Sequence, residues 1–364
     1  MRKLYWTLFL MIIAATLGAQ APARADNPIA PFVDSQTNAV IYVDVTSVDL
    51  DQLNAWQQKA MASTNIDALQ KARHQKQADD SIARAKKWVS DFKTAGGKDL
   101  YVVISLAGMM QGAPGGLIIP LNGANPDALA KVFNPNGNPP PADPNDPNAA
   151  QMRQMQQQTA VVGNALVYST GSGVEKLKTT SNEPRPDLAD ALSATDKATV
   201  RIAFVPSSLK NNPFVAAMLS ARRAPGGAPA QPPFSDPQWD AVSWVSISIT
   251  SPPKESGNCT MQCKDADSAV ALADLVTKKI QDAKTDSTQR GSISAEDFDK
   301  LAAAVKPKVD GSQVVMALDQ DTMDNVVGPI LARAAQRNSP PPPQAAPDQA
   351  PPAGPPAPPD NNGM

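Results

Sequence analysis

The sequence predicts an α+β fold with mainly antiparallel sheets, and three observations support this prediction. Runs rich in β-branched residues alternate along the chain with segments of helical sequence. Several of the strand-like runs alternate apolar and polar residues, which is typical of antiparallel sheets with one packed face. The same order of elements also occurs twice along the chain. We therefore expect two tandem βαββαβ halves of the ferredoxin-like kind.

The first half, residues 26–185, opens with a β-branched run at 39–45, and helical sequence follows from about Asp49 to Thr94. A helix is expected to begin after Asn125, because asparagine caps helices well and Pro126 suits the first helical position. The other elements expected in this half are strands at 99–106 and 116–121, a strand or hairpin at 159–168 that turns at Gly163-Asn164, and a short helix at 174–179.

The second half, residues 186–338, repeats this order. It opens with a β-branched run at 199–205 and continues with helical sequence from about Ser207 to Arg223. Asp265 is the expected N-cap of its long helix, at the position that Asn125 holds in the first half. The other elements expected here are strands at 241–250 and 258–264, a strand or hairpin at 308–318 with a turn at Asp310-Gly311, and a helix at 321–333.

Composition excludes several classes of function. The 364 residues carry a formal net charge of −2, which argues against a nucleic-acid binder because such proteins need a positive excess. Apolar residues make up 42% of the chain, so a sizeable core can form. A single histidine, His74, and two cysteines leave little for metal sites, haem ligation or histidine-based catalysis. We therefore expect no cofactor, no metal and no catalytic constellation, and the sequence leans against an enzyme.

Residues 1–25 resemble a secretory signal peptide. Arg2 and Lys3 precede an apolar run, and Ala23-Arg24-Ala25 places small residues at the positions that a signal peptidase requires. The apolar run is shorter than the ~20 residues needed to span a bilayer. We expect cleavage after Ala25, an exported periplasmic or extracellular protein, and no membrane span afterwards.

Proline-rich segments interrupt the two halves. The 36 prolines are about twice the usual share of ~5%. Residues 134–150 are expected to form a disordered loop and residues 224–237 a mobile loop, because proline, asparagine and glycine favour turns and oppose strands. Residues 339–364 are expected to form a disordered tail, since they hold too little apolar surface to offset the entropy of ordering.

At the level of element order, residues 39–48, 99–106 and 198–206 resemble the strands of uncharacterised exported bacterial proteins built from a duplicated strand–helix unit. The resemblance covers roughly residues 38 to 335. It implies the fold only and no activity, because no catalytic signature accompanies it.

Two weak motifs favour structural explanations. Cys259 and Cys263 lie four residues apart in an alternating strand, about 13 Å between Cα atoms, which is too far for a disulfide. We expect two buried thiols, with a disulfide as the alternative if the segment is a turn or a helix. The segment 286–297 resembles an EF-hand loop, but Arg290 stands where the metal needs an oxygen, so we expect a connector with Ser294 as a helix cap.

Two tryptophans and two serines give the best candidate surface. Trp239 and Trp244 lie at the start of the strand at 241–250, and Ser246 and Ser248 follow Trp244 with the same alternation. If these side chains share an open polar face, they form an aromatic platform for a partner. The alternative is that both tryptophans pack under the neighbouring loop or a helix.

The sequence therefore favours an exported, non-enzymatic binding protein. It would bind an unknown protein, peptide or glycan through a sheet face or the cleft between the halves. One alternative is an extracytoplasmic hydrolase that uses carboxylates on carbohydrate, and a cleft lined by acidic side chains would favour it. A second alternative is a structural protein of the cell envelope.

Overall fold

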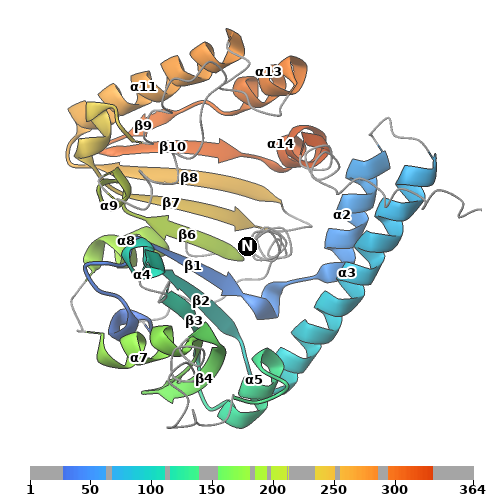
Figure 1. The fold of residues 1–364 in the computed structure, drawn as a ribbon. Coiled ribbons are helices and arrows are strands. Elements are labelled where there is room, and N and C mark those ends of the chain that lie inside the picture. The colour runs from blue at the N-terminus through green and yellow to red at the C-terminus, as the bar shows by residue number, and fades with distance from the viewer. Residues whose placement is uncertain are drawn as a thin grey trace, which may run out of the picture.

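The computed structural model describes residues 28–62, 68–110, 115–138, 155–180, 185–194, 198–210, 212, 234–250, 255–285 and 294–330. Within them ten strands form one antiparallel sheet in the order β4-β5-β3-β2-β1-β6-β7-β8-β10-β9 (Figure 1). The α+β class and the antiparallel pairing are confirmed. The predicted signal peptide, the proline-rich tail and most of the loops at 134–150 and 224–237 lie outside the described residues.

The strands are β1 (Ala39–Asp44), β2 (Asp99–Ile104), β3 (Gly115–Pro120), β4 (Gln157–Val162), β5 (Ala165–Thr170), β6 (Val200–Phe204), β7 (Val242–Thr250), β8 (Ser256–Cys263), β9 (Lys308–Asp310) and β10 (Gln313–Leu318).

The sheet order is the same from its centre toward both edges. The first half reads β1-β2-β3-β5-β4 and the second reads β6-β7-β8-β10-β9, and β1 pairs with β6 antiparallel to join them. The ferredoxin-like arrangement is not confirmed, because a split unit separates its first two strands, whereas β1 lies directly beside β2. The helices α2 (Leu50–Ala62) and α3 (Ala68–Thr94), which connect β1 to β2, form a long pair beside the sheet (Figure 1). The second half has the same neighbours, because β6 lies directly beside β7.

Both halves close their edge hairpins with the same two-residue turn. Val162 pairs with Ala165 across Gly163, and Asp310 pairs with Gln313 across Gly311. The two glycines have φ angles of 59° and 56°, in the left-handed region that favours glycine at the first position of a type II′ turn. The turn predicted at Gly163-Asn164 is therefore confirmed, whereas the turn predicted at Asp310-Gly311 lies one residue later, at Gly311-Ser312, because Asp310 pairs with Gln313.

The predicted helix caps are also confirmed. The Asn125 side chain accepts from the backbone N–H groups of residues 127 and 128 at the start of α5 (Pro126–Phe133). Asp265 accepts from the N–H of Ser268 at the start of α11 (Ala266–Thr285), and Ser294 accepts from the N–H of Asp297 at the start of α13 (Ala295–Ala304). Each cap satisfies donors that the first helical turn leaves without an intrahelical partner.

Helices cover both faces of the sheet, giving three layers. We call face A the face that carries Val40, Tyr42, Val103 and Ile118, and face B the face that carries Ile41. Face A packs against η1 (Ala30–Phe32), α7 (Gly171–Thr179) and α8 (Pro186–Ser193). Face B packs against α3 and α5 in the first half and against α11 and η3 (Pro237–Ala241) in the second. The remaining elements are η2 (Val45–Ser47), α4 (Leu106–Met110), α9 (Pro206–Lys210), α14 (Gln320–Thr322) and the π-helical turn η4 (Met323–Val327).

No helix among the described residues has the length and apolar character that a membrane crossing requires.

Candidate functional site

The four residues predicted to form a partner surface are not on an open surface. Trp244 is 6% exposed and packs in the core of face A, while Ser246 and Ser248 are 0% and 5% exposed. Trp239 is half-buried in η3 and packs edge-on against Phe234, with ring centroids 4.8 Å apart. Both tryptophans are therefore packed, which is the alternative that the sequence analysis left open. Ser246 and Ser248 do share face A with Trp244, because alternate residues of β7 point to the same side.

These serines belong to two polar rows that cross the second half of face A. In one row, the register of β6, β7 and β8 places Arg201 opposite Ser248, and Ser248 opposite Asn258. In the other row, Ser246 lies opposite Thr260. Directly opposed residues have Cβ atoms about 5 Å apart, so Arg201 and Asn258 lie about 10 Å from each other. We call Arg201, Ser246, Ser248, Asn258 and Thr260 the polar rows.

Three atoms of the polar rows are buried without a hydrogen-bond partner in the described part of the chain. They are the Nε of Arg201, the Oγ of Ser246 and the Oδ1 of Asn258. Buried polar groups are nearly always paired, and leaving one unpaired costs about 1–3 kcal/mol. Three such atoms on adjacent strands mark a place where ordered water or another polar molecule would complete the hydrogen bonds.

Arg201 is held in place by the first half of the sheet. Its guanidinium lies 4.0 Å from the centroid of the Tyr42 ring on β1, and its Nη1 donates to the carbonyl of Leu192 at 2.7 Å. The Tyr42 hydroxyl donates to Oδ1 of Asp99 at 3.2 Å. Burial raises the pKa of Tyr42 far above its usual value, and the Asp99 and Asp44 carboxylates add to the shift. Tyr42 thus stays a neutral donor, and the Arg201 side chain is fixed at the seam between the halves.

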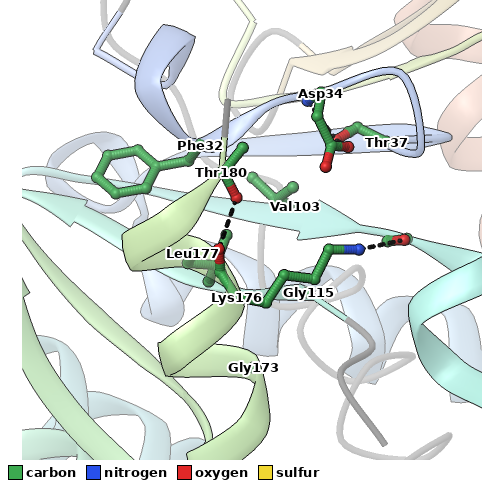
Figure 2. Close-up of a pocket in the computed structure, with 10 residues that line it drawn as sticks. Phe32, Asp34, Thr37, Val103, Gly115, Gly173, Lys176, Leu177 and Thr180 are labelled. Atoms are coloured by element: carbon green, nitrogen blue, oxygen red, sulfur yellow. Dashed lines mark hydrogen bonds between the residues drawn. The ribbon is translucent and has the colours of Figure 1, made fainter. Parts of the chain in front are cut away.

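A small hollow lies at the other end of face A, between η1, β3 and α7 (Figure 2). Figure 2 shows Asp34 and Thr37 on one side, Phe32 on the other, and Lys176 reaching from α7. The Lys176 amine donates to the Gln36 side chain at 2.8 Å and to Ser105 at 3.4 Å. The cavity volume is about 10 Å³, which is room for one water molecule. This hollow is therefore too small for a substrate, and its cation already has partners.

A carboxyl pair lies where the first half meets the end of the second. The Lys59 amine on α2 contacts Oδ2 of Asp324 in η4 at 2.9 Å, and the Trp56 ring packs on the backbone of Gly328. Glu255, which precedes β8, is 6% exposed and hydrogen-bonds Asp324. Burial raises the pKa of Glu255 to about 7, and the hydrogen bond and negative charge of Asp324 add to the shift.

The pKa of Asp324 moves in the opposite direction. Burial alone would raise it, but hydrogen bonds from Lys59 and Glu255, together with the Lys59 charge, outweigh burial and lower it. Below about pH 7 the pair therefore holds one proton on Glu255 and one negative charge on Asp324. No sequence pattern predicts that Glu255 and Asp324 lie together, because they are 69 residues apart and neither belongs to a motif.

The cysteines and the histidine that the sequence analysis singled out lie in regular elements of the fold. Cys259 and Cys263 are free thiols on face B. Cys263 is buried as expected, whereas Cys259 is only half-buried. Desolvation raises the pKa of Cys259 to about 11, so it stays protonated and unreactive. His74 lies within α3. Most of the EF-hand-like segment, residues 286–293, lies outside the described residues. No cluster of metal-ligating side chains occurs in the described ranges.

Comparison with protein-family models, curated proteins and solved structures finds no match for this chain.

Proposed function

We propose that this protein is exported and works as a non-enzymatic binding protein, whose ligand contacts the polar rows on face A. The observation that carries the proposal is the set of three buried atoms without partners, on Arg201, Ser246 and Asn258. Folding alone does not favour such atoms, so their presence together is best explained by a bound molecule. Export is supported by the signal-peptide pattern of residues 1–25.

The three atoms define the chemistry of the ligand. The Arg201 Nε–H donates, the Asn258 carbonyl oxygen accepts, and the Ser246 hydroxyl can do either. A matching ligand offers an acceptor and a donor about 10 Å apart or less, as the hydroxyl groups of a glycan or the amide groups of a peptide do. Because the rows are buried, binding requires movement of α8, which packs on β6 and β7.

Replacement of Ser246 tests whether its hydroxyl serves binding or folding. We expect Ser246→Ala to increase the free energy of unfolding by about 1 kcal/mol, because it removes a buried hydroxyl without a partner. Ser169, on the same face of β5, is the matched control. Its hydroxyl donates to the Gly115 carbonyl, so Ser169→Ala should lower the free energy of unfolding by about 1–3 kcal/mol. Urea titration followed by tryptophan fluorescence measures both changes.

Binding is measured on the same variants with glucose and triglycine as probes. Thermal shift and tryptophan fluorescence should report saturable binding of one probe by the wild-type chain, with weaker binding by Ser246→Ala and Asn258→Ala. Loss of stability in Ser246→Ala, together with no response to either probe, would contradict the proposal. That outcome would mean that water alone occupies the polar rows.

The hydrolase alternative has one observation in its favour. Glu255 and Asp324 form a carboxyl pair in which the raised pKa of Glu255, about 7, leaves part of the Glu255 population protonated near neutral pH, as a general acid requires. Hydrolysis of nitrophenyl glycosides by the wild-type chain, abolished in Glu255→Gln, would support this function. Absence of hydrolysis together with probe binding at the polar rows would favour the binding function.

We also infer that the two halves arose from one duplicated strand–helix unit. The shared sheet order, the matching edge turns at Gly163 and Gly311, and the equivalent caps at Asn125 and Asp265 support this inference.

A further inference from the structure

The two edges of the sheet differ in how well they are protected. β9 is three residues long and carries Lys308 and Asp310, and its middle residue Val309 is 42% exposed. β4 at the other edge has six residues, QQTAVV, with no charge and no proline. Short length and charged side chains are the usual means by which proteins protect an edge from pairing with another strand. By these criteria β9 is protected and β4 is open.

The geometry of the β4–β5 hairpin shows which backbone groups of β4 point outward. Val162 and Ala165 close a two-residue turn and therefore form a hydrogen-bonded pair. Alternation along the strand then directs the N–H and C=O groups of residues 157, 159 and 161 away from β5. The side chain of Val161 is 52% exposed, and Met155, just before the strand, is 62% exposed.

One side chain occupies the middle of this edge in the way that a neighbouring strand would. The Asn138 amide donates to the Thr159 carbonyl at 2.8 Å, and the Asn138 carbonyl accepts from the Thr159 N–H at 2.8 Å. A paired strand makes the same two bonds to an outward-facing residue. Asn138 therefore satisfies both outward groups of Thr159, and a partner strand must displace it.

We propose that β4 is a self-pairing edge, through which two copies of this chain join β4 to β4 antiparallel, in competition with Asn138. The outward groups lie symmetrically about Thr159, so a two-fold axis there places Thr159 opposite Thr159 and Gln157 opposite Val161. The absence of charge from β4 means that no like charges oppose each other across this axis. Because β4 is the only open edge among the strands that the structure describes, the assembly closes at two copies rather than growing into a fibre.

Light scattering coupled to size exclusion, over a wide range of protein concentration, tests the proposal. Asn138→Ala removes the competing bonds, so its dimerisation constant should be at least about tenfold tighter than that of the wild-type chain. Adding Thr159→Lys or Thr159→Pro to Asn138→Ala should abolish the dimer, because Thr159→Lys places two like charges opposite each other on the two-fold axis. Proline at 159 removes only an outward-facing N–H, so the β4–β5 ladder is kept.

The matched control is Asn138→Ala with Val309→Lys, which adds a lysine to the protected edge and should leave the dimer unchanged. Circular dichroism and the melting temperature check that every variant is folded. A folded Asn138→Ala that stays monomeric at all concentrations would overturn the proposal. A dimer lost with Val309→Lys but kept with Thr159→Lys would do so too.

Discussion

The wild-type chain is expected to lose stability as pH rises from about 4.5 to above 7, and Glu255→Gln is expected to remove most of this loss. Burial and Asp324 raise the pKa of Glu255 to about 7 in the folded chain, against 4.5 for the free side chain. The folded state therefore binds more protons than the unfolded state within this window. The stability contribution of the Glu255 proton is complete below about pH 4.5 and is lost as pH rises through 7, by roughly 1–3 kcal/mol.

Urea unfolding at a series of pH values measures this effect. Glutamine resembles the protonated glutamate, so Glu255→Gln should match the wild-type chain near pH 5 and exceed its free energy of unfolding at pH 8. Glu296→Gln on α13 is the matched control, because Glu296 is exposed and forms an ion pair with Lys300 on the same helix. A wild-type chain whose stability does not change between pH 5 and 8 would show that Glu255 ionises normally.

The lowered pKa of Asp324 predicts a second pH range, on the acid side, in which stability changes. Its lowered pKa means that its charge contributes stability above the pKa of the unfolded chain, and this contribution is lost as pH falls through the lower, folded value. Stability should thus decline on both sides of the weakly acidic range. Lys59 is the partner of Asp324 at 2.9 Å, so Lys59→Met should reduce the acid-side decline.

Gly115→Ala is expected to be the most damaging single change near the hollow of Figure 2. Gly115 has a φ angle of 112°, and a Cβ there would lie 2.0 Å from the carbonyl oxygen of Val103. Neither backbone segment can yield without breaking the β2–β3 pairing, and the Gly115 carbonyl would move away from Ser169. We expect a loss of about 3 kcal/mol or more in the free energy of unfolding.

Gly123→Ala measures the cost of backbone strain alone, without the steric clash that a Cβ at position 115 makes with the Val103 carbonyl. Gly123 also has a positive φ angle, 88°, but a Cβ there would meet nothing within 4 Å. Its replacement should cost only about 1 kcal/mol, the usual cost of placing alanine at positive φ. Equal effects of the two variants would argue against a close approach at Gly115. Chemical denaturation of both variants provides the comparison.

Local rules predicted the fold well wherever a short pattern determines the structure. The caps at Asn125, Asp265 and Ser294 and the turn at Gly163 depend on a few neighbouring residues, and all are confirmed. The ferredoxin-like arrangement is not confirmed, because element order does not specify which strands are neighbours.

The candidate site was predicted in part. The alternation of β7 placed Ser246 and Ser248 on one face with Trp244, but it could not show that helices and neighbouring strands bury that face. Arg201 and Asn258 complete the polar rows from other strands, and only the register brings them there. The signal that could have found Arg201 is its position as the one charged residue inside the apolar run 199–205.

The antiparallel pairing of β1 with β6 has a consequence for how the chain can be divided. β1 and β6 each satisfy the backbone hydrogen-bonding groups at the inner edge of the other half. Excising either half would expose a long apolar strand and leave Arg201 without the Tyr42 ring beneath it. The halves are thus inseparable in practice, and the chain should melt in one cooperative transition instead of two.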